Sequence, residues 1–397
     1  MWSSVVVVAG DRWRPAWADI DIGAARHNAS VLRHLIGPSA LCAVVKADGY
    51  GHGALLMARA ALDGGATWLA VALVEEGVVL REAGIDAPIL LLSEPPAEAM
   101  AEAVARRLVP TVYSEAGLRA LGQAVQAHPG DPVDVHLKVD TGMHRVGADP
   151  ADAVSLADAI AAVGGLRLGA VWTHLAVADG IGAVDVDFTE LQLARFARVL
   201  SELSDAGHRP LMTHVANSAA TIAYPGSRRD LVRCGIALAG VLPSQALADR
   251  LSEATGGQGV RPVLSLRARV AVVRDLGAGE RPSYGRVRSL EAPSTVATVP
   301  IGYADGVPRR LFDCGGEVLI GGIRRPLAGV VTMDQIVVDC GPVGTAPVSV
   351  GDEVVLIGRQ GAVEISATEW ADLLGTINYE VLCDIGPRVP RLVVDEQ

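Results

Sequence analysis

Residues 41–62 read LCAVVKADGYGHGALLMARAAL, and the pattern of residue types in this stretch predicts one strand, one turn and one helix. An apolar run ends in Lys46, three glycines follow within seven residues, and apolar residues then recur at helical spacing from 54 to 62. The same alternation continues as far as residue 242. Apolar strands that alternate with helices are typical of a parallel sheet covered by helices.

Eight strands are expected in this part of the chain, and helices fill the gaps between them. The expected strands are residues 41–46, 68–72, 89–92, 109–112, 133–139, 166–172, 211–214 and 231–236. The helices include residues 54–62, 74–83, 98–107, 115–127 and 187–206. This pattern predicts an α/β fold with an N-terminal (β/α)8 TIM-like barrel. A doubly wound sheet is the alternative, because periodicity does not show whether a sheet closes.

The composition and the expected secondary structure change after residue 242. Residues 243–259 are polar and rich in glycine, which indicates a domain boundary. Short alternating strands are expected at 264–273, 294–299, 316–320, 329–331, 336–339 and 352–357, and a helix at 367–374. We therefore expect a barrel domain at 12–242 and a mainly-β C-terminal domain at 260–397.

Composition limits the classes of function. Half of the 397 residues are hydrophobic and 20% are charged, as in globular proteins. No apolar run approaches the ~20 residues of a membrane span, and the N-terminus has no basic segment typical of a signal peptide. The net charge of −11 disfavours nonspecific nucleic-acid binding. Five widely spaced cysteines suit a reducing cytoplasm, and no metal-ligand spacing is present.

Basic side chains stand at the ends of two predicted strands. Lys46 ends the first strand, Lys138 lies at the end of the fifth, and Arg145 follows in a glycine-containing loop. Lys46 is either an ion-paired lysine or an amine nucleophile with a lowered pKa. Lys138 shares a strand face with His136 and is either part of an internal ion-pair network or chemically neutralised. Arg145 suits a carboxylate or phosphate clamp.

Polar residues also end the last three predicted strands. His174 follows the sixth strand, His214 ends the seventh and Arg233 lies on the eighth. One such histidine is more often a packing residue than a catalyst, but several at neighbouring strand ends indicate a site. The loops after strands seven and eight commonly bind phosphate in these barrels, so Ser218 and Gly235 predict a phosphorylated ligand.

Nine motifs, in order along almost the whole chain, resemble those of the alanine racemase family. They are VVKADGYGHG (44–53), KVDTGMHRVG (138–147), WTHLAVAD (172–179), HVANSAAT (214–221), VRCGIALAG (232–240), PSYGR (282–286), PIGYADG (300–306), TMDQ (332–335) and NYEVLCDIGPRVPR (378–391). Related decarboxylases share the barrel but not the C-terminal motif.

The resemblance implies pyridoxal 5′-phosphate (PLP) as cofactor, held covalently by Lys46. Arg233 would face the pyridine nitrogen, His174 would stack on the ring, and the full set of implied cofactor-binding residues is Lys46, Tyr50, Leu92, His174, Asn217, Ser218, Arg233, Gly235 and Ile236. Arg145 and the backbone near Met333 would hold the substrate carboxylate. Lys138, His214 and Asp334 would support the site, and the lysine that matches Lys138 is often carbamylated in the family.

The implied reaction is the racemisation of alanine by two bases on opposite faces of Cα. Lys46 would serve one face and Tyr284 the other. A tyrosine has an ordinary pKa near 10, so it needs cationic neighbours to act as a base. In the family, the residues that match Tyr284 and Met333 reach the other subunit's site, which implies a homodimer with shared active sites.

Four positions depart from the family pattern. Pro387 replaces a usual tyrosine near the phosphate, Ala239 another aromatic residue, Thr332 a usual cysteine and His144 a usual glycine. A roomier pocket leaves open a racemase of another small amino acid such as serine, or an aldolase acting on a β-hydroxy amino acid. A catalytically silent PLP-binding protein is a further alternative, which the joint presence of two candidate bases disfavours.

Overall fold

The computed structural model describes residues 13–128, 130–345 and 347–395, and the chain divides into two compact units. The barrel unit comprises residues 25–49 and 54–261. The β unit comprises residues 13–24, 50–53 and 262–395.

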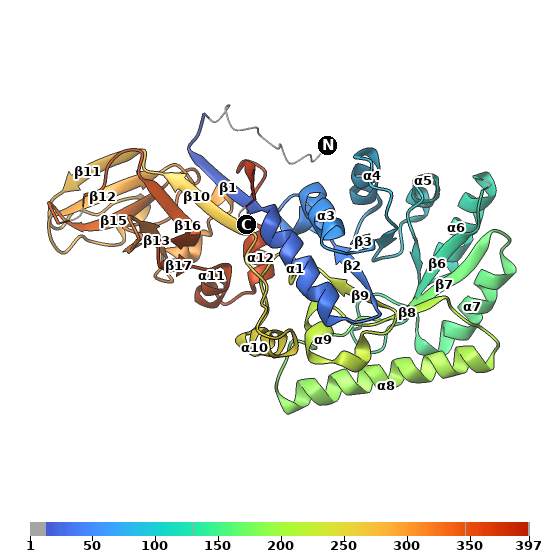
Figure 1. Ribbon diagram of the computed structural model, residues 1–397. Coiled ribbons are helices and arrows are strands. Elements are labelled where there is room, and N and C mark those ends of the chain that lie inside the picture. Colours follow the sequence, from blue (N-terminus) through green and yellow to red (C-terminus); the bar gives the residue numbers. More distant parts are fainter. Residues whose placement is uncertain (1–12, 129, 346, 396–397) are drawn as a thin grey trace. The chain divides into compact units, whose positions relative to one another are not determined.

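The barrel unit is built on a parallel sheet of eight strands (Figure 1). They are β2 (Ala40–Val44), β3 (Trp68–Val71), β4 (Ile89–Leu91), β5 (Thr111–Val112), β6 (Val133–Lys138), β7 (Leu166–Trp172), β8 (Met212–His214) and β9 (Leu231–Cys234), in the spatial order β4-β3-β2-β9-β8-β7-β6-β5. Leu90 forms a parallel bridge with Val109 just before β5, and Val109 N–H donates to Ile89 O at 2.8 Å. The two ends of the sheet thus meet, so the predicted barrel is confirmed and the open doubly wound sheet is wrong.

Helices cover the outside of this barrel and connect its strands (Figure 1). They are α1 (Ile22–Leu35), α3 (Ala54–Asp63), α4 (Val74–Glu82), η1 (Ala97–Ala99), α5 (Met100–Ala105), α6 (Glu115–Ala127), η2 (Pro150–Asp152), α7 (Ala153–Ala162), α8 (Ala183–Asp205), α9 (Ser218–Ala223), η3 (Pro225–Ser227) and α10 (Gln245–Ala254). The short segment α2 (Lys46–Tyr50) is a turn with left-handed backbone angles at residues 47–49. Ser114 caps α6, since its hydroxyl accepts from Gly117 N–H at 2.9 Å. No helix within the described ranges combines the length and apolarity that a bilayer crossing requires.

The barrel interior is polar and aromatic toward one side. Lys138 on β6, Trp172 on β7, His214 on β8 and Arg233 on β9 are all buried. Barrel interiors of this fold are usually filled by branched aliphatic side chains. Burying charged groups here has a cost unless they are hydrogen-bonded, which points to function.

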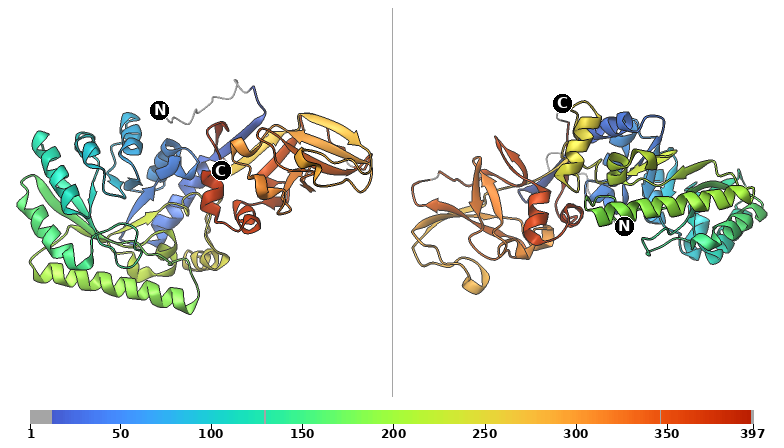
Figure 2. Two further views of the ribbon diagram at one scale, coloured as in Figure 1. Left: turned by 180° about the vertical axis from the view of Figure 1, so that it is seen from behind. Right: turned by 90° about the horizontal axis from the view of Figure 1, so that it is seen from below.

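The β unit contains two sheets, drawn mainly in yellow to red in Figure 2. One sheet has the order β14-β13-β16-β10-β1-β18 with β17 on β16, and the other has the order β11-β12-β15. The strands are β1 (Ala16–Asp21), β10 (Leu264–Arg269), β11 (Val272–Leu276), β12 (Ser294–Val299), β13 (Glu317–Ile320), β14 (Ile323–Pro326), β15 (Ile336–Pro342), β16 (Glu353–Gln360), β17 (Val363–Ile365) and β18 (Arg391–Val394). The helices are η4 (Tyr284–Arg286), η5 (Tyr303–Asp305), η6 (Arg309–Leu311), α11 (Ala367–Leu374) and α12 (Asn378–Cys383).

The N-terminal strand belongs to the β unit. β1 pairs antiparallel with β10 and parallel with β18, so its backbone hydrogen bonds join it to the C-terminal part of the chain. The observed division therefore differs at this end from the expected barrel domain at 12–242. Strand pairing over a long sequence separation leaves no local signal, which is why the boundary differs.

Two local predictions were wrong. Residues 264–273 form two strands, because Val270 N–H donates to Asp352 O and Ala271 N–H to Thr298 O, and the chain changes sheets between them. Residues 329–331 form no strand, and the carbonyl of Val330 accepts from the Ser283 hydroxyl at 2.6 Å. Residues 243–259, the expected boundary segment, contain the helix α10, which buries Leu247 and Leu251, and the two units divide shortly after it, between residues 261 and 262.

Candidate active site

Lys46 stands at the end of β2, where the chain enters a left-handed turn. Ala47, Asp48, Gly49 and Tyr50 all have φ between 51° and 65°. Non-glycine residues adopt this conformation only at a cost, so strain here points to a site that other contacts hold in place. Those contacts include the Glu76 carboxylate, which accepts from Ala47 N–H at 2.6 Å. The turn therefore places the half-buried Lys46 at the C-terminal end of the barrel strands.

Lys46 and Lys138 are the only lysines in the 397-residue chain. Every other strongly basic side chain is an arginine, whose guanidinium keeps its proton and offers no reactive amine at neutral pH. Both lysines lie at the ends of barrel strands. The two lysine side-chain amines of the chain thus both lie at ends of barrel strands.

Arg233 is buried and donates only to uncharged acceptors. Its Nη1 donates to Nδ1 of His214 at 2.8 Å, and its Nη2 donates to Nδ1 of His174 at 3.2 Å. Nη2 also donates to the carbonyl oxygens of Thr173 and Val215, each at 2.9 Å. Burial lowers the pKa of Arg233 to about 10, so the guanidinium stays charged at neutral pH.

Positive charge gathers around His174. Burial lowers the pKa of His174 well below its usual range, and four cationic side chains act in the same direction: Arg233, Lys138, Arg145 and Lys46. Burial also lowers the pKa of Lys138 to about 7. Among the described groups that act on Lys138, Asp140 is the one acid. This excess of cations suits an anionic ligand.

Ser218 and the turn after β9 form a group of hydroxyl and amide donors. Ser218 begins α9, and the Asn217 side chain caps that helix by accepting from Ala220 N–H at 2.9 Å. The Ser218 hydroxyl accepts from Gly235 N–H at 3.0 Å, and the buried Ile236 follows. This confirms that Ser218 begins a helix and that Gly235 lies in the last strand-to-helix turn, as an oxyanion site of this fold would need.

Leu92 and Arg145 complete the expected residues of the barrel unit. Leu92 follows β4, and its carbonyl oxygen lies 3.5 Å from Lys138 Nζ. Arg145 is exposed in the loop after β6, which Asp140 shapes by accepting from Gly142 N–H at 2.8 Å. The barrel unit thus contains eleven expected residues: Lys46, Leu92, Lys138, Arg145, His174, His214, Asn217, Ser218, Arg233, Gly235 and Ile236.

The other expected residues belong to the β unit. Tyr50 lies with its ring centre 6.2 Å from that of Tyr379. Tyr284 is 75% exposed and stands in a turn where Ser283 and Arg286 have φ of 67° and 47°.

Met333 and Asp334 form a second exposed group of the β unit. Met333 is exposed, and the neighbouring Asp334 accepts from Arg388 Nη2 at 2.7 Å. Arg388 also forms an ion pair with Asp305 at 3.3 Å. Pro387, at the position of the usual family tyrosine, is exposed beside this pair.

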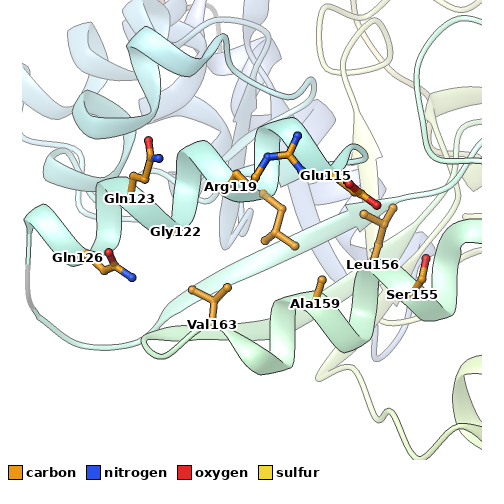
Figure 3. A pocket seen from close by; sticks show the side chains of 10 residues that line it. Glu115, Arg119, Gly122, Gln123, Gln126, Ser155, Leu156, Ala159 and Val163 are labelled. Atoms are coloured by element: carbon orange, nitrogen blue, oxygen red, sulfur yellow. Dashed lines mark hydrogen bonds and ion pairs between the residues drawn. The ribbon is translucent and has the colours of Figure 1, made fainter.

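A separate cavity of about 430 Å³ lies between α6 and α7 on the outside of the barrel (Figure 3). Its described lining includes Glu115 and Arg119, which form an ion pair at 3.1 Å, together with Leu118, Leu156 and Val163. None of the site residues named above is among the described residues that line it. The cavity is therefore distinct from the group of site residues at the ends of the barrel strands, which we call the strand-end site.

Comparison with known proteins agrees with this geometry over both units. Residues 20–243 match the family model described as alanine racemase, N-terminal domain, and residues 263–393 match the model for the C-terminal domain. The chain belongs to the alanine racemase family. It is 45% identical to the alanine racemase of Symbiobacterium thermophilum over 390 residues, which cover 96% of this chain and 97% of that protein.

Solved structures of alanine racemases have the same fold. The enzyme from D-cycloserine-producing Streptomyces lavendulae matches with a TM-score of 0.88 and 38% identity, over 98% of this chain and 99% of that one. The enzyme from Bacillus anthracis with bound L-Ala-P matches with a TM-score of 0.89 and 35% identity, over 98% and 97%.

The alanine racemase family is PLP-dependent, and the barrel unit fits that cofactor. Lys46 supplies an amine, the Ser218–Gly235 group supplies hydroxyl and amide donors for a phosphate, and the cations around His174 offset negative charge. A buried Arg233 without a carboxylate among its hydrogen-bond partners suits a polar ring atom of a ligand.

Three further aromatic side chains carry no role in the site predicted from the sequence: His136 and Trp172, which are buried, and Trp68, which is half-buried. His136 Nδ1 lies 3.0 Å from His214 Nε2, the Trp172 ring stacks on the His214 ring with centres 5.2 Å apart, and the Trp68 ring centre lies 5.5 Å from that of His136. The sequence indicated only one of these residues, because alternation along the strand places His136 on the same face as Lys138. Their contacts join strands that are far apart in the sequence.

Proposed function

We propose that the chain interconverts L- and D-alanine, with PLP as its cofactor and the strand-end site of the barrel as its active site. The observation that carries this proposal is the gathering of Lys46, Lys138, Arg145 and Arg233 around His174 in a chain that has no other lysine. Membership in the alanine racemase family supports the reaction, and the anionic cofactor and substrate account for the excess of cations.

Bound PLP supplies an electron sink that makes the Cα proton of the amino acid acidic. Lys46 would hold the cofactor covalently through its amine, and the same amine, when free, would move a proton at one face of Cα. Tyr284 moves the proton at the opposite face. Two bases on opposite faces explain inversion without any rotation of the substrate.

The residues named for phosphate binding share one chemistry. Ser218 offers a hydroxyl, Tyr50 a phenol, and Gly235 and Ile236 their backbone N–H groups at the turn after β9. None of these donors to the phosphate dianion is a lysine or an arginine. The cationic side chains of the site therefore remain available for the substrate carboxylate and the cofactor ring. Leu92 and Asn217 shape the walls of the site.

Arg233 would face the pyridine nitrogen of the cofactor in this proposal. Its guanidinium keeps its proton because burial lowers its pKa only to about 10, and four hydrogen bonds fix its orientation. A group that does not give up a proton limits the build-up of negative charge in the ring. This limit favours simple proton return over competing reactions of the same amino acid, such as decarboxylation.

The substrate carboxylate is held by Arg145 and by the backbone near Met333, with Asp334 and Lys138 in supporting positions. A carbamate on Lys138 would turn a buried cation into an anion and would orient Arg145 by an ion pair. The pKa of Lys138, lowered to about 7, supports this chemistry because it leaves a fraction of free amine at neutral pH.

The proposed assembly is a homodimer in which Tyr284 and Met333 act in the partner's site. The 75% exposure of Tyr284 on a strained, hydrogen-bonded turn supports a surface that works on another chain. The proposed location is the cytoplasm, supported by five cysteines that are widely spaced in the sequence.

The test is chiral analysis of the products from L-alanine and D-alanine with the PLP-loaded protein. We expect both to converge on a racemic mixture. L-serine and a β-hydroxy amino acid are assayed beside them, to detect another racemase or an aldolase. A protein that binds PLP but leaves both alanine enantiomers unchanged would overturn the proposal.

A further inference from the structure

Three histidines and one arginine form a single chain of hydrogen bonds in the barrel interior. His136 Nδ1 lies 3.0 Å from His214 Nε2, and His214 Nδ1 lies 2.8 Å from Arg233 Nη1. Arg233 Nη2 lies 3.2 Å from His174 Nδ1. His136, His214 and Arg233 are almost fully buried, so water does not supply alternative partners for their ring and guanidinium nitrogens.

The positions of the protons along this chain follow from one rule. A guanidinium has N–H donors and no acceptor, so Nδ1 of His214 and Nδ1 of His174 must both be unprotonated acceptors. Neutral His214 then carries its proton on Nε2. That proton points at Nδ1 of His136, which must accept it, and neutral His136 carries its own proton on Nε2.

Both rings are neutral in the folded protein. Burial lowers the pKa of His136 to about 3; the negative charge of Asp134 acts against this lowering, and the positive charge of Arg233 adds to it. Burial and Arg233 also lower the pKa of His214 well below its usual range. In a doubly protonated His214, the Nδ1–H group would point at an N–H group of Arg233, so two donors would meet. The hydrogen-bond geometry and the lowered pKa thus both indicate a neutral His214.

We propose that His136 is a positioning residue for Arg233: its Nδ1 accepts the Nε2 proton of His214 and so stabilises the tautomer of His214 that offers Arg233 an acceptor at Nδ1. Packing holds the two rings in register. Trp172 stacks on His214 with ring centres 5.2 Å apart and an angle of 19°, and Trp68 lies 5.5 Å from His136.

Loss of the acceptor at residue 136 has a defined consequence. The buried Nε2–H of His214 would have no partner, and His214 would move its proton to Nδ1 to recover a bond elsewhere. The guanidinium of Arg233 would then face a donor instead of an acceptor and lose its fixed orientation. Its effect on the reaction rests on the proposed role of Arg233 at the cofactor.

The test compares His136→Asn with His136→Leu, two side chains with the same branched shape and the same number of heavy atoms. The Oδ1 atom of asparagine stands as many bonds from Cα as Nδ1 of histidine, so it can accept the same proton, whereas leucine cannot. Magic-angle-spinning ¹⁵N NMR of protein labelled at its nine histidines reports the tautomer of His214, whose signals are assigned with His214→Asn. This readout needs neither PLP nor activity.

We expect wild type and His136→Asn to show His214 protonated at Nε2, and His136→Leu to populate the Nδ1–H form. In the PLP-loaded enzyme, kcat for alanine should fall about tenfold in His136→Leu and recover in His136→Asn, which is the scale of one lost buried hydrogen bond. The KM should change much less than kcat.

Two results would overturn the proposal. One is a wild-type His214 protonated at Nδ1, which decides the matter even if the leucine variant does not fold. The other is a leucine variant that keeps the Nε2–H form, or an asparagine variant that behaves like leucine in both readouts. An inactive wild type with the expected tautomer would instead refute the proposed function and leave the hydrogen-bond assignment standing.

Discussion

The ammonium nitrogen of Lys138 lies 4.3 Å from the centre of the Trp172 ring. The guanidinium carbon of Arg233 lies 4.5 Å from the same ring, so one indole contacts two cations. A cation over an indole gains about 0.5–2 kcal/mol, which offsets only part of the cost of burial. Since the pKa of Lys138 is lowered to about 7, this lysine is poised between its charged and its free-amine form near neutral pH.

Lys138 should form a carbamate with dissolved CO2. Only the free amine reacts, and because the pKa is lowered to about 7 the free fraction rises as the pH passes from 6 to 8. We expect a carbamate ¹³C NMR signal in protein equilibrated with ¹³C-bicarbonate, growing over that pH range. Lys138→Arg should lose this signal and the matched Lys46→Arg should keep it. A signal that survives in Lys138→Arg would contradict the assignment.

Substitution of the two lysines should have different effects on the visible absorbance of the PLP-loaded protein. Lys46→Arg removes the only amine at the end of β2, so the protein should lose the visible absorbance of covalently bound PLP and all measurable racemase activity. Lys138→Arg is the matched control and should stay yellow. The measurement is the absorbance spectrum before and after borohydride reduction, with peptide mapping of the labelled lysine. Label found on Lys138 alone would refute the role of Lys46.

Tyr284→Phe should bind PLP but lose proton transfer at one face of Cα. General acid–base groups contribute about 10²–10⁴-fold, and we expect a loss in that range. Exchange of the Cα proton in deuterated water is followed for L-alanine and D-alanine separately, and one enantiomer should keep exchanging. Undiminished exchange of both would show that Tyr284 is not the second base.

Shared active sites should allow complementation between inactive subunits. A dimer of one Lys46→Ala chain and one Tyr284→Phe chain keeps one site with both bases if Tyr284 acts in the partner's site. We expect mixing after mild dissociation to restore part of the activity, up to about one quarter of wild type in a statistical mixture. Heterodimers proven by differential tags yet devoid of activity would show that each chain uses its own tyrosine.

Pro387→Tyr should narrow substrate choice. Pro387 is exposed, has no hydroxyl and stands next to Arg388, which binds Asp334. An added phenol fills volume, and serine exceeds alanine by one hydroxyl; a misfit of one methylene-sized group costs about 10–200-fold in a tight pocket. We expect kcat/KM for serine to fall relative to alanine by about tenfold. An unchanged ratio would mean that other residues close the pocket.

Much of the site was predictable from local sequence. Lys46 ends an apolar strand and is followed by Gly49 and Gly51, and this pattern specifies a strand and a turn through interactions between near neighbours. The same holds for Ser218 at the start of α9 and Gly235 after β9. The alternation of strands and helices predicted the barrel, although its closure through Leu90 and Val109 needed the structure.

Tertiary structure alone decided how the buried polar groups pair. His136, His214 and Arg233 lie on β6, β8 and β9, and His214 is 78 residues from His136 in sequence. Their tautomers depend on which nitrogen faces which, and no periodicity or motif encodes that. Likewise β1 joins the β unit through ladders to β10 and β18. Local patterns determine elements because neighbouring residues interact in every conformation, whereas partners distant in the sequence meet only once the chain has folded.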